Sequence, residues 1–172
     1  MTSTPPKLGS VEKLNTNHKV ESFDCGSEPL NRFLKSHALG NQKAGGVQTY
    51  VVCRHPDLVV GFYSICVGGV EYDHAPQRVA KGLAKHPIPV MLLARLAVDQ
   101  TEQRHGLGRA LLKDSLLRTA QAAEIAGIRA LLVHAKDERA KAWYEDFDFE
   151  PSPTDPLHLF LLMKDIQTIL KG

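Results

Sequence analysis

The sequence lacks the residue patterns that build metal centres or disulfide frameworks. Its 172 residues contain three cysteines, Cys25, Cys53 and Cys66, and no two of them form a C-x-x-C pair. Its eight histidines include no H-x-x-x-H or H-x-x-E-H pair of the kind that binds zinc on a helix. We therefore expect reduced thiols and no metal ion.

Long hydrophobic runs are also missing. A membrane span needs about 18 consecutive apolar residues, and stretches such as 157–163 end far sooner. The segment 1–7 has no apolar core and no small-residue cleavage site of a secretory signal. We expect a cytoplasmic protein with no membrane anchor.

Charge is nearly balanced, which excludes a polycation that binds nucleic acid with its whole surface. The chain has 21 Lys+Arg against 19 Asp+Glu, a net charge of +2, and 43% of its residues are hydrophobic. Any nucleic-acid partner would need basic residues gathered on one face. The length and this composition predict one globular domain over residues 1–172.

Hydrophobic periodicity predicts an α/β fold. A helix that Ser27 can cap, with Pro29 in its first turn, should bury Leu30, Phe33, Leu34 and Ala38 and end at Gly45-Gly46. The other predicted elements are strands at 11–14, 48–53, 59–70, 90–98, 130–135 and 157–163, helices at 103–126 and 138–147, and an exposed loop at 73–89 with one helical turn at 77–83.

Gly68-Gly69 indicates a bulge or bend, and Gly127 is placed as the residue after the long helix. The strand, helix and strand between 90 and 135 form a βαβ unit, whose two strands should be parallel. A hairpin followed by such a unit predicts a mixed central sheet of about six to seven strands flanked by about four helices.

The segment 95–110 carries the chemical signal. Gly106 and Gly108 fall in the first turns of the predicted long helix, where each glycine costs about 1 kcal/mol relative to alanine. An anion bound by the free N–H groups of the helix start would offset this cost, and Arg104, His105 and Arg109 would add positive charge. The alternative is that the glycines let the helix pack tightly on the sheet. No Walker A loop is present, and Leu111 occupies the third glycine position of the dinucleotide fingerprint.

The spacing Gln103-x-x-Gly106-x-Gly108 after a buried strand resembles the Q/R-x-x-G-x-G/A acyl-CoA loop of the GNAT N-acetyltransferases. A closer resemblance, to the GNAT toxins of type II toxin-antitoxin systems, involves segments along most of the chain. These are Phe23-Asp24-Cys25-Gly26, Leu30-Asn31-Arg32-Phe33-Leu34, Pro87-Ile88-Pro89-Val90, Arg95-Leu96-Ala97-Val98-Asp99 and Trp143-Tyr144 before Pro151-Ser152-Pro153. Ala94 and Asp148 depart from the pattern, since relatives carry glycine there.

This resemblance implies the GNAT fold, with acyl-CoA bound at a splayed strand followed by the long helix. It implies transfer of acetyl from acetyl-CoA to the α-amine of the amino acid on charged tRNA, which blocks translation. It also implies a ribbon-helix-helix antitoxin and a homodimer. The residues that it assigns to the cofactor are Leu96, Ala97, Val98, Gln103, Arg104, His105, Gly106, Leu107, Gly108, Arg109 and Ala110.

The resemblance makes Tyr144 the general acid that protonates the leaving thiolate. The alternative interpretation is that Tyr144 only packs with Trp143. No general base stands out. An α-amine titrates near 8 and a lysine near 10.4, so an aminoacyl substrate needs little help to lose its proton.

Arg95 interrupts an apolar strand, and either a structural ion pair or a grip on the tRNA 3′ end would explain it. Arg78, Lys81 and Lys85 are the candidate RNA contacts. Further basic residues that could border the cleft are Arg32, Lys35, Lys136, Arg139 and Lys141. Two other functions remain open: a GNAT enzyme acting on a small amine or a protein amine, and a non-catalytic acyl-CoA sensor.

Overall fold

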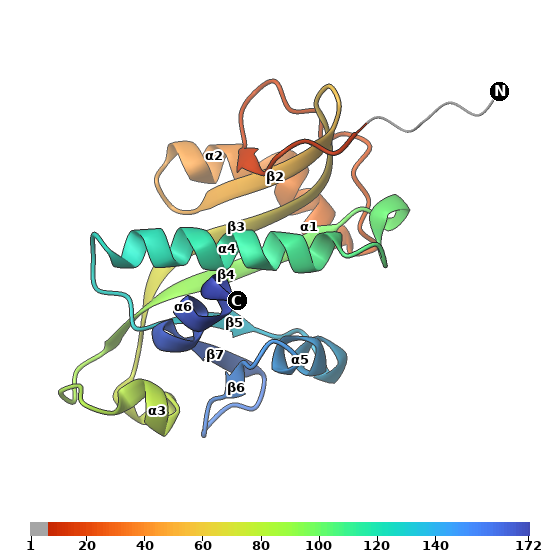
Figure 1. Ribbon diagram of the computed structural model, residues 1–172. Coiled ribbons are helices and arrows are strands. Elements are labelled where there is room, and N and C mark those ends of the chain that lie inside the picture. Colours follow the sequence, from red (N-terminus) through yellow and green to blue (C-terminus); the bar gives the residue numbers. More distant parts are fainter. Residues whose placement is uncertain (1–6) are drawn as a thin grey trace. The chain divides into compact units, whose positions relative to one another are not determined.

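The computed structural model describes residues 7–172 (Figure 1). Residues 1–6, which hold most of the segment searched for a secretory signal, lie outside the described part. The described chain divides into two compact units. The first contains the residues up to Ile65 together with Arg95–Asp114, and the second contains Cys66–Ala94 and Ser115–Gly172. Among the described helices, none is long and apolar enough to cross a membrane.

Seven strands form a mixed sheet in the order β1-β2-β3-β4-β5-β7-β6. Their bounds are β1 Glu12–Lys13, β2 Gln48–Arg54, β3 Leu58–Val70, β4 Ile88–Val98, β5 Ala130–His134, β6 Glu150–Pro151 and β7 His158–Leu162. The strands β4 and β5 pair in parallel, as the predicted βαβ unit requires, whereas β1 with β2, β2 with β3, and β7 with both β5 and β6 pair antiparallel. The predicted mixed α/β sheet is confirmed.

The helices are mostly short. They are α1 Glu28–Arg32, the π-helical turn η1 Phe33–His37, α2 Ala38–Lys43, the 3-10 turns η2 Tyr72–His74 and η3 Gln100–Glu102, α3 Gln77–Ala80, α4 Leu107–Ala123, α5 Glu138–Glu145 and α6 Met163–Lys171. The helix predicted after Ser27 is therefore three consecutive segments with a π-turn in the middle. Ser27 does occupy the position before α1, but its side chain makes no capping hydrogen bond with the described residues. The prediction that its hydroxyl caps the helix is therefore wrong.

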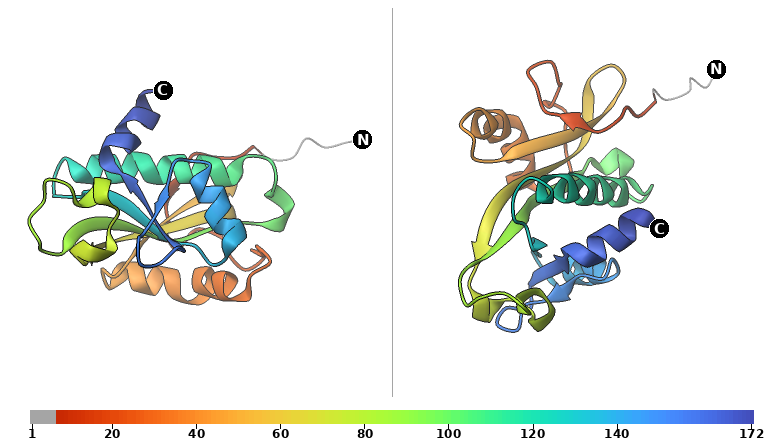
Figure 2. Two further views of the ribbon diagram at one scale, coloured as in Figure 1. Left: turned by 90° about the horizontal axis from the view of Figure 1, so that it is seen from below. Right: turned by 60° about the vertical axis from the view of Figure 1, so that its left-hand side comes forward.

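The first unit packs helices on both faces of the β2-β3 hairpin. Phe62 of β3 contacts Phe23 and Phe33, with ring centroids 5.5 and 6.2 Å apart. The preceding residue, Gly61, faces α4. A Cβ added to Gly61 would lie 2.9 Å from Leu111 Cδ1. Successive strand residues point to opposite faces, and the left view of Figure 2 shows α1-α2 and the start of α4 on opposite sides of these strands.

The second unit contains its own apolar core, and this core corrects the expected exposed loop at 73–89. Ala75, Val79, Ala80 and Ile88 are buried against residues of β4, β5 and β7. Pro87, Pro89 and the charged residues of this segment are exposed, whereas Pro76 and these apolar side chains are buried. The helical turn expected at 77–83 is confirmed by α3, but the expected exposure is wrong for these buried residues. Their burial depends largely on β5 and β7, which come much later in the chain.

The long helix is shorter than its sequence pattern suggests. It begins at Leu107 and not at Gln103, and it ends at Ala123 and not at Ala126. Gly106 precedes the helix with φ +83°, a backbone conformation that favours glycine. Gly127 is not one of the described glycines with a positive φ, so it does not form a left-handed cap at the end of α4.

Three further details differ from expectation. The strand β4 is buried over its first half, but Ala94, Arg95 and Leu96 are half-exposed. The short strand β6, which contains Pro151, was not among the predicted strands. The final strand ends at Leu162, and the helix α6 follows it (Figure 1).

Candidate functional site

The loop before α4 adopts a backbone suited to an anion. Arg104 and Gly106 both have left-handed backbone angles, φ +68° and +83°. No described atom lies within 4 Å of the place where a Cβ on Gly106 would stand. Alternating left-handed residues at the start of a 17-residue helix let consecutive N–H groups converge. The loop backbone therefore favours the anion-binding interpretation of Gly106.

Gln103, expected to contact the cofactor, directs its side chain elsewhere. Its amide Nε2 donates to Val98 O at 2.8 Å and to Cys25 O at 3.1 Å. A side-chain amide has two N–H donors, so both are used within the protein. Only the Gln103 backbone is left to interact with an anion through a donor.

Asp99 joins the same loop to the segment after residue 23. Its Oδ2 accepts a hydrogen bond from Asp24 N at 2.9 Å, and its Oδ1 accepts from Thr101 N and Oγ1 at 3.0 and 2.8 Å. Gln100 N donates to Asp24 O at 2.8 Å. Asp99 is 7% exposed, so these bonds replace nearly all of its water contacts.

The side chain of Asn31 holds the segment that Asp99 contacts. The Asn31 side chain accepts from Cys25 N at 2.9 Å and donates to Asp24 Oδ1 at 3.0 Å. Hydrogen bonds from Gly26 N and Asn31 lower the pKa of Asp24. Asp24, Asn31 and Asp99 were not assigned a role from the sequence, although all three lie in segments that carry the toxin resemblance.

An ion pair holds the other side of the loop. Arg54 at the end of β2 donates Nε and Nη2 to the two carboxylate oxygens of Glu102, which is 6% exposed. The carboxylate raises the pKa of Arg54. Glu102 is the last residue of η3, so this ion pair joins the turn to Arg54 at the end of β2.

Arg95 stacks on an aromatic ring. Its guanidinium carbon lies 3.6 Å from the ring centroid of Phe33, which lies in the π-turn. A cation over a ring face is attracted by the ring quadrupole. This contact supplies a packing partner for a charged residue on β4, and it links β4 to the helix that carries the toxin resemblance.

Tyr144 lies in an aromatic group of the second unit. It is on α5, whose start is capped by Asp137 Oδ1 accepting from Ala140 N at 2.8 Å. The Tyr144 ring meets Trp143 and Phe149 edge-on, with centroids 5.0 and 5.3 Å apart. Burial raises the pKa of Tyr144 to about 12. The packing with Trp143 is therefore real, and it also keeps the phenol protonated.

Asp148, one of the two departures from the toxin pattern, has φ +71°. This left-handed conformation explains why relatives carry glycine at the position, and aspartate tolerates it better than most residues do. The substitution keeps the local turn.

The candidate RNA contacts are not equivalent. Arg78 donates to both carboxylate oxygens of Asp165, at 2.9 and 3.1 Å, and also lies 3.9 Å from Glu150. Its charge is already compensated, which weakens its assignment as an RNA contact. Lys81 and Lys85 are exposed. The segment that carries Lys81 is positioned by Arg129, which donates to the carbonyl oxygens of Arg78, Val79 and Lys81.

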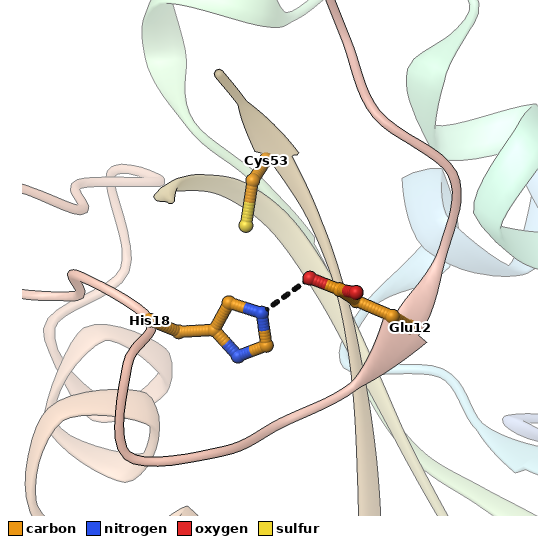
Figure 3. Close-up of side chains that lie close together, drawn as sticks. All are labelled: Glu12, His18 and Cys53. Carbon is orange, nitrogen blue, oxygen red and sulfur yellow. Dashed lines mark hydrogen bonds and ion pairs between the residues drawn. The ribbon is translucent and has the colours of Figure 1, made fainter. Parts of the chain in front are cut away.

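Glu12, His18 and Cys53 gather from distant positions, with ligand-type atoms within 4.8 Å of one another (Figure 3). His18 Nδ1 accepts a hydrogen bond from Asn15 N at 3.0 Å, so its proton is on Nε2, which donates to Glu12 at 2.6 Å. Desolvation, then the charges of Glu12 and Asp57, raise the pKa of the Cys53 thiol to about 11. A metal would have to displace the Nε2 proton of His18 and the thiol proton of Cys53, and the interaction that joins His18 to Glu12 is a hydrogen bond.

The chain is similar to known proteins over most of its length. Residues 46–151 match the acetyltransferase (GNAT) domain family. A tRNA-acetylating toxin of Mycobacterium tuberculosis is 49% identical over 151 residues, which are 88% of this chain and 90% of that protein.

Two solved structures of the AtaT toxin are similar to the whole fold. AtaT complexed with acetyl-methionyl-tRNAfMet has a TM-score of 0.88 and 29% identity, covering 95% of this chain and 99% of that one. A tyrosine-to-phenylalanine mutant of AtaT, bound to the C-terminus of the antitoxin AtaR and to acetyl-CoA, has a TM-score of 0.82 and 28% identity, covering 96% and 99%. With the family match and the loop geometry, these likenesses confirm the predicted fold, and the chain belongs to the GNAT acetyltransferase family.

Proposed function

We propose that this protein is a toxin acetyltransferase that transfers acetyl from acetyl-CoA to the α-amine of the amino acid on charged tRNA and so blocks translation. The observation that carries the proposal is the 49% identity, over 88% of the chain, to a tRNA-acetylating toxin. The similarity to AtaT complexed with acetyl-methionyl-tRNAfMet supports the same substrate class.

The loop before α4 fits the diphosphate of acetyl-CoA. Backbone N–H groups from Arg104 to Arg109 would bind its oxygens, because the left-handed angles of Arg104 and Gly106 turn them toward one point. The N–H of Ala110 is not available, because it donates to Gly106 O at 3.1 Å. The backbone of Leu96, Ala97 and Val98 on β4 would bind the pantetheine arm and polarise the thioester oxygen. The AtaT structure that holds acetyl-CoA supports this cosubstrate.

The reaction needs an unprotonated amine and a proton for the leaving group. The amine nitrogen attacks the thioester carbon, the C–S bond breaks, and the thiolate takes a proton from the phenol of Tyr144. Solvent then protonates the Tyr144 phenolate, and solvent also accepts the proton that the amine loses. Because an α-amine titrates near 8, a useful fraction is unprotonated at neutral pH without a protein base.

In the acid role the Tyr144 phenol is protonated at neutral pH, and burial makes it a weaker acid than a free phenol. Its pKa of about 12 lies above that of a free thiol, near 8.5, so proton donation must accompany C–S cleavage and not precede it. An edge-on aromatic contact on each side limits the directions in which the ring can turn.

Lys81 and Lys85 are the proposed RNA contacts, with Arg95 as a candidate for the 3′ end. Phosphate binding by exposed lysines would be salt-dependent. Arg78 is assigned a structural role instead, because Asp165 pairs with both of its terminal nitrogens.

The remaining assignments follow the toxin relatives. We infer that residues 1–172 work as one GNAT domain, since the family match runs through both compact units. A ribbon-helix-helix antitoxin would bind the chain, consistent with the AtaT structure that contains the C-terminus of AtaR. We also infer a homodimer, and a cytoplasmic location because charged tRNA is found there.

The test is acetylation of total charged tRNA with labelled acetyl-CoA, followed by nuclease digestion and mass identification of the acetylated aminoacyl-adenosine. Deacylated tRNA is the control and should take no label. Acetyl on the amino acid supports the proposal and names the isoacceptor. Label on lysine peptides or small amines, with none on charged tRNA, would favour the other GNAT substrate classes.

A further inference from the structure

We propose that the segment Phe23–Asn31, called here the signature segment, is a positioning element for the cofactor loop and not a substrate contact. Gln103 is its principal positioning residue on the loop side. The inference rests on the proposed function in one respect, namely that the loop before α4 binds acetyl-CoA.

The first step is the direction of the Gln103 side chain. Gln103 directly precedes Arg104, the residue with φ +68°. Its amide donates to Val98 O on β4 and to Cys25 O in the signature segment. The first residue of the acyl-CoA motif therefore joins the loop to two different parts of the first unit.

The second step is the exchange of hydrogen bonds between Asp24 and the residues after β4. Asp24 N donates to Asp99 Oδ2, and Asp24 O accepts from Gln100 N. Both groups of the Asp24 backbone are thus paired with the approach to the loop. Since Asp99 is almost fully buried, losing its partners would leave a desolvated charge, which is costly.

The third step is the rigidity of the signature segment itself. Asn31, 5% exposed, pairs with Cys25 N and with Asp24 Oδ1. Gly26 has φ +89°, and a Cβ there would stand 2.9 Å from Gln100 Nε2. The backbone conformation therefore favours glycine at this position, whereas the close atom is the far end of the Gln100 side chain, which can move.

These contacts explain how the loop keeps an unfavourable backbone. A non-glycine residue in the left-handed region costs of order 1 kcal/mol or more and persists only where its surroundings impose it. The signature segment imposes it on Arg104 through Gln103. Without this support the loop would relax, and its N–H groups would no longer converge before acetyl-CoA binds.

The experiment compares Gln103→Met with a matched control, Gln42→Met. Gln42 also uses its amide to join backbone groups of the first unit, donating to Leu14 O at 2.8 Å and accepting from Thr49 N at 2.9 Å, but it lies on α2. Calorimetry would give the Kd for acetyl-CoA, steady-state kinetics the KM for charged tRNA, and hydrogen exchange the protection of amides 104–108 without ligand.

We expect the Kd for acetyl-CoA to rise about tenfold in Gln103→Met, with faster exchange at 104–108 and a KM for charged tRNA within twofold of wild type. Gln42→Met should lower Tm but leave the Kd and the loop exchange unchanged. If folded Gln103→Met binds acetyl-CoA as wild type does, or its loop exchange is unchanged, the inference is overturned and the proposed function stands. If wild type does not bind acetyl-CoA, the proposed function fails, and the inference fails with it.

Discussion

The two regions assigned to the chemistry differ in the side chains that hold them: one is polar and the other is aromatic. The cofactor loop and its approach, residues 99–106, are held by polar side chains that pair with backbone groups. The surroundings of Tyr144 on α5 are aromatic, with Trp143 and Phe149 against its ring. The first arrangement fixes the directions of N–H groups, and the second removes water from a phenol.

The difference matches what each region has to do. Binding a diphosphate needs several donors aimed at one place, and hydrogen bonds are the directional interactions that can aim them. Keeping a proton on a phenol needs only desolvation, because a buried tyrosine resists ionisation. Each of the following predictions alters one region and leaves the other as its reference.

The largest effect is expected from Tyr144→Phe. Removing the phenolic proton should lower kcat for acetyl transfer about a thousandfold, within the range for loss of a general acid. The Kd for acetyl-CoA and the Tm should change little, because the ring still packs on Trp143 and Phe149. Single-turnover kinetics with labelled acetyl-CoA would measure the loss, and retention of wild-type turnover would contradict the role of general acid.

The next effect compares two capping aspartates. Asp99→Ala leaves the N–H groups of Asp24 and Thr101 without their buried acceptor, and should lower the free energy of unfolding by about 3 kcal/mol. Asp137→Ala removes an exposed cap from α5 and should cost about 1 kcal/mol. Urea denaturation of both variants measures the difference. Equal losses would show that burial of Asp99 contributes nothing beyond capping.

A third comparison separates free from paired basic residues in the second unit. The double variant Lys81→Glu with Lys85→Glu should weaken binding of charged tRNA about tenfold at low salt and reduce the salt slope. Arg78→Ala should change tRNA affinity less than twofold, because Asp165 already compensates its charge. Filter binding across a salt series would test both. A larger loss in Arg78→Ala would restore Arg78 as an RNA contact.

The smallest expected effect concerns alkaline pH. Because the pKa of Tyr144 is raised to about 12, the phenol stays protonated up to that region, and activity should be lost only as pH rises through it. The rate should therefore rise with ionisation of the α-amine near pH 8 and stay within twofold between pH 9 and 10. An amide-linked aminoacyl-RNA analogue avoids ester hydrolysis in this test. A falling limb centred near pH 10 would mean that the phenol is not desolvated.

Much of the fold could be predicted because its signals are local. The hairpin of β2 and β3, the parallel strands β4 and β5, and α5 follow from strand alternation, apolar runs and turn residues within short windows. The helical turn within 73–89 was predicted, but the burial of residues such as Val79 was not, because they pack on strands far along the chain. The helix α6 was missed although Ile166, Ile169 and Leu170 keep helical spacing.

The candidate site divides in the same way. The spacing of Gly106 and Gly108 favours an anion-binding loop, and the predicted helix at 138–147 corresponds to α5, which carries Tyr144. The uses of Gln103 and Arg78 could not be anticipated, because a glutamine or arginine offers donors in any direction until its neighbours are known.

The sequence by itself determined the family, the strand and helix that flank the cofactor loop, and the residue types available for acetyl transfer, since these depend on local spacing and side-chain chemistry. Only the tertiary structure decided which of those residues pair with distant parts of the protein. The bond from Asp24 to Asp99 joins residues 75 positions apart, and the ion pair of Arg78 with Asp165 joins residues 87 apart. Hydrogen bonds and ion pairs act over a few ångströms in space, so their partners are set by folding and not by order along the chain.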